Sequence, residues 1–108
     1  MADKYHNKRI SVDGEVFDSK KEARRYQQLK LMEKAGMIRN LKRQVRRELV
    51  PAQYIDGKCV ERAITYTSDF EYDTDVHVVE DVKGMKTDAY KLKRKLMLYI
   101  HGIRITEI

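Results

Sequence analysis

Two acids and a lysine stand at the end of a segment that otherwise has the composition of a buried strand. The segment covers residues 77–83 and reads His-Val-Val-Glu-Asp-Val-Lys. Since side chains alternate along a strand, Asp81 and Lys83 should share one face, with Glu80 on the other. Buried charges are unfavourable unless they are paired or bind a metal ion. Phosphodiester hydrolysis would give the cluster a role, because carboxylates bind Mg²⁺ and a lysine can position water and stabilise developing charge.

The acid-x-Lys pair in this strand is a weak signal by itself. With 17 acids and 13 lysines in 108 residues, chance alone gives about two such pairs, and three are present. Those at residues 18–20 and 56–58 fall at a predicted helix start and in a predicted turn. Only Asp81-x-Lys83 lies in an apolar segment, where a solvated strand end is the alternative explanation.

Asp69 is a second acid that could reach the same place. It lies in the segment 64–72, Ile-Thr-Tyr-Thr-Ser-Asp-Phe-Glu-Tyr, which is predicted to be a strand. If this strand and the next form a hairpin about residues 73–75, Asp69 pairs near residues 79–81 and can share an ion with Asp81. The alternative is an edge aspartate beside aromatic residues.

Glu22 is the third acid, and it lies on a predicted helix. On a helical wheel it shares a face with Tyr26 and Leu29, which should pack on the sheet. Its carboxylate would then point at the sheet as a third metal ligand. The alternative is a capping box, because Ser19 stands three residues before it at the expected helix start.

These acids need a sheet with helices packed against it, and the turn and capping signals predict one. Asp-Gly pairs at 13–14 and 56–57 are typical of hairpin turns, and Gly36 and Gly102 of helix ends. The expected elements are a hairpin over residues 10–17, a helix over 18–35, a strand over 37–50, a hairpin over 52–60, strands over 63–72 and 76–82, a helix from Thr87 or Asp88 to about His101, and a strand over 103–108. This order predicts an α/β or α+β fold with a mixed sheet flanked by helices, in one domain with a flexible basic arm over residues 1–9.

Four stretches of the chain, taken together, resemble a known family. They are Phe17-Asp-Ser-Lys-Lys-Glu22-Ala-x-x-Tyr26, Tyr66-x-x-Asp69-Phe70, Val79-Glu-Asp81-Val-Lys83-Gly84 and Tyr90-x-Leu-Lys93-x-Lys95-Leu96. In this order, over nearly the whole chain, they resemble a phage-encoded family catalogued only as a domain of unknown function. That family belongs to the PD-(D/E)XK nuclease superfamily, together with Holliday-junction resolvases, phage junction endonucleases and transposase endonuclease subunits.

The resemblance implies a restriction-endonuclease-like core and a site made by Glu22, Asp69, Asp81 and Lys83. The three acids would bind one or two Mg²⁺ ions, with Mn²⁺ as the alternative metal, and Lys83 would act beside them. The superfamily's proline before the first aspartate is replaced here by Ser68.

Further residues are predicted to support the site or to bind DNA. Supporting candidates are Glu80, on the opposite face from Asp81, Gln44, where related nucleases often carry a glutamine, and Lys91 and Lys95, one turn apart on the last helix. A surface glutamine and a solvated helix face are the respective alternatives. Backbone contacts with DNA are expected from Lys4, Lys8, Arg9, Lys42, Arg43, Arg46 and Arg47.

The distribution of charge favours a polyanionic partner. The formal net charge is +6, with 14 Lys/Arg and 7 Asp/Glu in residues 1–50, 2 and 8 in residues 51–82, and 7 and 2 in residues 83–108. An acidic centre between two basic ends suits a metal site inside a phosphate-binding cradle, whereas a uniform basic coat would suggest binding alone. Simple solubility is the bland alternative.

Composition also excludes several classes of protein. Cys59 is the only cysteine, so no internal disulfide can form and a cysteine-based zinc site is not expected. No segment has the roughly 18 apolar residues of a membrane-spanning helix, and the N-terminus has no secretion signal. We therefore expect a soluble protein of the bacterial cytoplasm, encoded by a phage or prophage.

Three functions are compatible with these patterns. The first is a Mg²⁺-dependent DNA endonuclease acting on branched or structured DNA such as Holliday junctions, because 108 residues leave little room for reading bases. Resolving a junction requires two cuts and hence a homodimer, for which the first hairpin and the last helix and strand are candidate surfaces. The others are a non-catalytic nucleic-acid-binding module and a structural phage protein. Acids inside an apolar strand favour the first.

Overall fold

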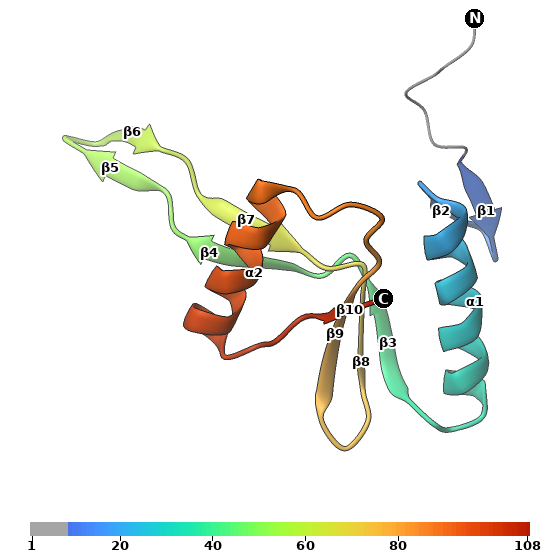
Figure 1. Ribbon diagram of the computed structural model, residues 1–108. Coiled ribbons are helices and arrows are strands. Elements are labelled where there is room, and N and C mark those ends of the chain that lie inside the picture. Colours follow the sequence, from blue (N-terminus) through green and yellow to red (C-terminus); the bar gives the residue numbers. More distant parts are fainter. Residues whose placement is uncertain (1–8) are drawn as a thin grey trace, which may run out of the picture.

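The computed structural model of the protein describes residues 9–108, and it has the α+β class that the sequence predicts (Figure 1). In chain order the elements are β1 (Ile10–Val12), β2 (Glu15–Phe17), α1 (Lys20–Lys34), β3 (Arg39–Arg43), β4 (Arg46–Val50), β5 (Gln53–Ile55), β6 (Lys58–Glu61), β7 (Ile64–Thr67), β8 (Phe70–Asp73), β9 (His77–Asp81), α2 (Asp88–His101) and β10 (Thr106–Glu107).

A four-stranded sheet lies between the two helices (Figure 1). Its strand order is β10-β9-β8-β3; β10 is parallel to β9 and the other pairs are antiparallel, which confirms the expected mixed sheet. Alternation along the strands divides the core into two clusters. Phe70 and Tyr72 of β8 pack with α1 on one face, and Val79 of β9 packs with α2 on the other.

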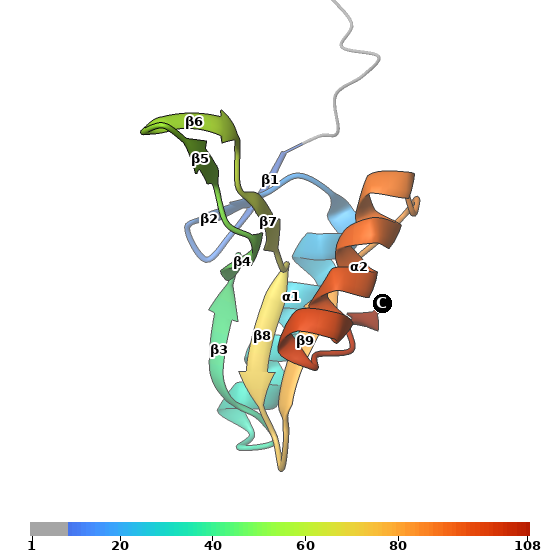
Figure 2. The ribbon, with the colours of Figure 1, turned by 90° about the vertical axis from the view of Figure 1, so that its left-hand side faces the viewer.

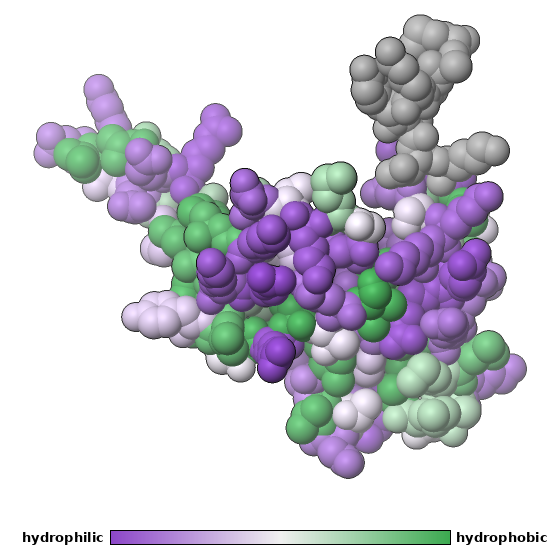
Figure 3. Space-filling model, in the orientation of Figure 1, coloured by the Kyte–Doolittle hydropathy of each residue, from purple (hydrophilic) through white to green (hydrophobic). Residues whose placement is uncertain are grey.

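Residues 39–73 form one long antiparallel ribbon that folds back at Asp56–Gly57. The pairing of β3 with β8 continues as β4 with β7 and then β5 with β6. The outer end, β5–β6, projects from the rest of the molecule, and its residues are exposed (Figures 1 and 2). The surface seen in Figure 3 is largely hydrophilic, with hydrophobic residues on this projecting end.

The ribbon bends where the sequence predicted unbroken strands over residues 37–50 and 63–72. Gln44 adopts a left-handed conformation with φ of 53°, which interrupts one strand. Opposite it, the Gln44 N–H donates to the Asp69 carbonyl at 3.2 Å, and the Ser68 N–H donates to the Val45 carbonyl at 3.0 Å. The bend therefore places Asp69 between β7 and β8, where it can face more than one element.

Both helices begin as their capping signals predict. The Ser19 hydroxyl accepts a hydrogen bond from the Glu22 N–H at 3.1 Å, and the Thr87 hydroxyl accepts one from the Tyr90 N–H at 3.1 Å. Thr87, rather than Asp88, is thus the N-cap of α2. Gly102 ends α2 with φ of 67°, a conformation that favours glycine.

The last predicted strand is shorter than expected. Residues 103–108 alternate in polarity, but only Thr106 and Glu107 pair with β9. Ile103 and Ile105 instead pack in the core cluster beneath α2. The alternation therefore reflects core packing for Ile103 and Ile105, and the strand itself is confined to Thr106 and Glu107.

Neither helix of the part that the structure describes is long and apolar enough to cross a membrane.

Candidate active site

Asp81 lies at the end of β9 with only 1% of its surface exposed. The Tyr66 hydroxyl donates a hydrogen bond to Asp81 Oδ2 at 2.6 Å. The other oxygen, Oδ1, is buried and has no hydrogen-bond partner among residues 9–108; Lys83 Nζ lies 3.4 Å from it as an ion pair. A buried carboxylate oxygen without a hydrogen bond is rare in proteins, and it offers a coordination position to a cation.

Asp69 faces Asp81 across the β8–β9 pairing, as the hairpin register predicts. Its N–H donates to the Glu80 carbonyl at 3.2 Å, and its Oδ2 accepts the Val82 N–H at 2.7 Å. Burial, followed by the hydrogen bond with Asp81, raises the pKa of Asp69 to about 8. Asp69 therefore holds a proton at neutral pH in the metal-free protein, and a nearby cation would favour its ionised form.

Glu22 reaches Asp69 from the first turn of α1. It is 8% exposed, and burial is the main cause that raises its pKa, while the guanidinium of Arg43 at 3.9 Å lowers it. Asp69 and the backbone of Asp18 lie near the Glu22 carboxylate, and both affect its pKa. The Glu22 N–H takes part in the helix cap at Ser19, while its carboxylate lies near Asp69, so the two predicted roles of this position are compatible.

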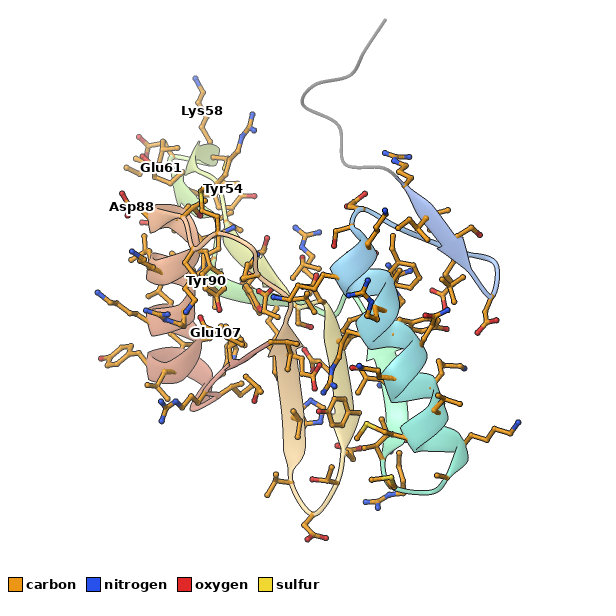
Figure 4. All side chains as sticks on the ribbon, turned by 45° about the vertical axis from the view of Figure 1, so that its right-hand side comes forward. Tyr54, Lys58, Glu61, Asp88, Tyr90 and Glu107 are labelled. Atoms are coloured by element: carbon orange, nitrogen blue, oxygen red, sulfur yellow. The ribbon has the colours of Figure 1, made fainter. Side chains whose placement is uncertain are left out.

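Lys83 is held in place by an aromatic residue of α2. Its Nζ lies 4.8 Å from the centre of the Tyr90 ring. The Tyr90 hydroxyl donates to Glu107 at 2.7 Å, and Glu107 also pairs with Lys86 and Arg94 at 3.0 Å each. Tyr90 and Glu107 lie close together beside α2 (Figure 4), and the Tyr90 hydrogen bond is the main cause that lowers the pKa of Glu107 to about 2.

Tyr66 and Tyr90 had no predicted role, although both stand in the quoted motifs. Tyr66 orients Asp81 and Tyr90 supports Lys83. The only sequence signal was a tyrosine within a quoted motif, three residues before Asp69 in one case and near the start of the last predicted helix in the other. That pattern does not distinguish a hydrogen-bonded tyrosine from an ordinary core aromatic.

The donor set fits a hard divalent cation. Within residues 9–108, no three His, Cys, Asp or Glu side chains already form a metal-binding group, and the contacts run in pairs, Glu22 with Asp69 and Asp69 with Asp81. All the donors are carboxylate oxygens, the type that Mg²⁺ and Mn²⁺ prefer. One of these oxygens, Asp81 Oδ1, is buried without a hydrogen bond, and a bound cation would favour the ionised form of Asp69.

Glu80 stabilises the fold rather than the site. It is fully buried on the α1 side of the sheet, opposite Asp81. Arg25 donates to its two oxygens at 2.9 and 2.6 Å, and the Tyr72 hydroxyl donates to Oε2. The paired charges attach α1 to the sheet, so any support that Glu80 gives the site is indirect.

The other predicted supporting residues do not bring their side chains to the acids. Gln44 has an exposed side chain, and it acts through its N–H, which bonds the Asp69 carbonyl. Lys91 is exposed on α2, and Lys95, also exposed, lines a groove with His77 and Arg104. The lysine of α2 that lines the same cavity as Lys83 is Lys93.

Two of the arginines predicted to contact DNA are engaged in ion pairs within the fold. The Arg43 guanidinium pairs with Glu15 at 2.9 Å and lies 3.9 Å from the centre of the Phe17 ring, and Arg47 makes a two-point ion pair with Glu71. Both are held inside the fold because alternation turns them inward. Lys42 and Arg46 of the neighbouring positions are exposed, as is Arg9; Lys4 and Lys8 lie outside the described residues.

Comparison with known proteins gives one family. The family model described as "Protein of unknown function (DUF1064)" matches residues 2–106, nearly the whole chain. No significant match was found among curated proteins or among solved structures. The chain therefore belongs to the DUF1064 family.

Proposed function

We propose that this protein is a divalent-metal-dependent endonuclease that hydrolyses phosphodiester bonds in DNA. The observation that carries the proposal is the meeting of Glu22, Asp69 and Asp81 beside Lys83. The three acids come from α1, from the bend between β7 and β8, and from β9. Burial makes the ionised form of Asp69 unfavourable and raises its pKa, and a bound cation would offset that cost.

The residues have complementary roles in this chemistry. Glu22, Asp69 and Asp81 would hold Mg²⁺ or Mn²⁺, which when bound supplies Lewis-acid activation of water and of the phosphate. Lys83 stands 3.4 Å from Asp81 Oδ1, where its ammonium can orient the attacking water and stabilise negative charge on the phosphate. Tyr66 and Tyr90 keep Asp81 and Lys83 in these positions.

The resemblance to junction endonucleases supports branched or structured DNA as the substrate and a homodimer as the active form. It also supports action inside a bacterial host, with a phage or prophage as the source. Lys42 and Arg46, both exposed, are available to contact the backbone on one side of the site.

A substrate panel tests the proposal. The protein is incubated with a four-way junction, a nicked duplex, a flap and single-stranded DNA, each with Mg²⁺, Mn²⁺ or EDTA. We expect metal-dependent cutting that falls by about 100-fold or more in Asp81→Asn and in Lys83→Gln. Asp75→Asn and Lys91→Gln, exposed residues of the same types, serve as matched controls and should cut normally.

Cutting that survives both site substitutions would overturn the site. If the wild type binds DNA but cuts none of the substrates with either metal, the non-catalytic binding module would be favoured instead.

A further inference from the structure

A cavity adjoins the acids, between β7 and the start of α2. Its volume is about 320 Å³, at the lower end of the range of about 300–1,000 Å³ that ligand pockets occupy. The polar groups on its wall come from Thr65, Thr67, Thr87, Lys83 and Lys93. Tyr66 and Lys83, which both contact Asp81, also line it, so the cavity opens directly beside the carboxylates.

The wall of this cavity is cationic. Two lysines and three threonines are among its lining residues, and no acid is. The Thr87 hydroxyl accepts the Tyr90 N–H and so keeps its own hydrogen free to donate. Such a wall, with hydrogen-bond donors and positive charge and no carboxylate, selects an oxyanion.

Lys93 is the lysine of α2 that lines this cavity. Lys86 and Arg94 pair with Glu107, and Lys83 pairs with Asp81, but Lys93 has no carboxylate partner within residues 9–108. Its side chain is half-buried, whereas Lys91 and Lys95 are exposed. A half-buried cation without a counter-charge is unfavourable, and a bound anion would compensate it.

We infer that this cavity binds the phosphate next to the scissile one on the strand being cut, with Lys93 as its main contact. The inference rests on the proposed function, because it assumes that the scissile phosphate lies at Glu22, Asp69 and Asp81. A strand passing from the acids over Lys83 enters the cavity between β7 and α2. Lys93 then positions the substrate, whereas Lys83 and the three acids act on the reacting atoms.

Binding without cutting gives the first test. The affinity of a fluorescein-labelled four-way junction is measured in Ca²⁺ over a series of salt concentrations, for wild type, Lys93→Gln and the matched control Lys91→Gln. We expect Lys93→Gln to weaken binding by about three- to tenfold and to lower the slope of log K against log salt by about one. Lys91→Gln should stay within about twofold of wild type, and equal melting temperatures exclude a folding defect.

A substrate change gives the second test and separates a phosphate contact from a general loss of charge. A neutral methylphosphonate replaces the phosphate flanking the mapped cut site. We expect it to raise the KM of the wild type as Lys93→Gln does, and to leave no further loss when Lys93→Gln is tested on it.

Unchanged binding in Lys93→Gln, or equal losses in Lys93→Gln and Lys91→Gln, would overturn the inference while leaving the endonuclease proposal standing. If the wild type cuts nothing but Lys93→Gln still lowers the salt slope, the endonuclease proposal fails and the cavity stands as a phosphate site of a binding module.

Discussion

The Tyr66 hydroxyl bonds one oxygen of Asp81 at 2.6 Å and leaves the other oxygen buried without a hydrogen bond within residues 9–108. This pairing fixes the plane of the carboxylate and turns Oδ1 toward Lys83. Since Asp69 is joined to the same carboxylate, the orientation of Asp81 decides whether the acids can act on one ion.

Tyr66→Phe tests this relationship. The variant keeps the ring in the core but removes the hydroxyl, so we expect the affinity for Mn²⁺ to fall by about tenfold or more. It should also lose about 1–3 kcal/mol of stability, because a buried acceptor is left unsatisfied. Titration calorimetry with Mn²⁺ and urea unfolding check these values. Tyr54→Phe, at an exposed tyrosine of the ribbon, is the control, and unchanged Mn²⁺ affinity in Tyr66→Phe would contradict the assigned role.

The raised pKa of Asp69 predicts how the stability of the metal-free protein depends on pH. Its pKa is raised from 3.8 to about 8, so the folded state binds a proton that the unfolded state has lost between these values. The stability of the metal-free protein should therefore fall as pH rises through this window, and low-millimolar Mg²⁺ should restore it by a few degrees of Tm.

Asp69→Asn isolates that contribution. Thermal unfolding of the variant should show a flatter pH dependence than the wild type over the same window, and no stabilisation by Mg²⁺. A variant that keeps the wild-type response to both pH and Mg²⁺ would show that Asp69 lies outside the metal site.

His77 predicts a pH dependence with a different origin. Its ring nitrogens lie 2.7 Å from Asp73 and 2.7 Å from Glu71, and these hydrogen bonds raise its pKa above 6.5. Its stabilising contribution should be complete below pH 6.5 and lost as pH rises through the raised value. Because the ring is half-exposed, we expect the difference between wild type and His77→Asn to be about 0.5 kcal/mol at acidic pH and to shrink at alkaline pH. Urea unfolding at about pH 5.5 and pH 8.5 measures it, and a difference that grows with pH contradicts the assignment.

The Arg25–Glu80 pair predicts a large effect on stability. Arg25→Met leaves the Glu80 carboxylate buried with only the Tyr72 hydroxyl as a partner, so we expect a loss of about 3 kcal/mol. Arg24→Met, at the exposed neighbouring arginine of α1, should change stability by less than about 0.5 kcal/mol. Replacing both partners, as Arg25→Met with Glu80→Gln, should recover part of the loss. Equal effects of the two arginine substitutions would show that the pair does not hold α1 to the sheet.

Local signals in the sequence predicted the fold's elements well. Ser19, Thr87 and Gly102 act where their capping chemistry places them, and the two Asp-Gly pairs make the hairpin turns. Alternation on β9 correctly separated Asp81 from Glu80, because it depends only on strand geometry.

The features that could not be predicted from the sequence depend on contacts between elements that are far apart along the chain. The bend at Gln44 arises from the pairing of two strands, and a non-glycine residue in a left-handed conformation has no clear local signature. Arg43 and Arg47 pair with acids more than twenty residues away in the sequence. A run of basic residues does not indicate which of its side chains point into the fold. Lys93 was passed over for Lys91 and Lys95 because helical spacing alone does not say which face meets β7.

The most direct test of the central claim is the single-turnover rate of cutting a four-way junction by the wild type and by Asp81→Asn in Mg²⁺. We expect cutting by the wild type that EDTA abolishes, and a rate at least about 100-fold lower in Asp81→Asn with a wild-type melting temperature. Equal rates in the two proteins would contradict it.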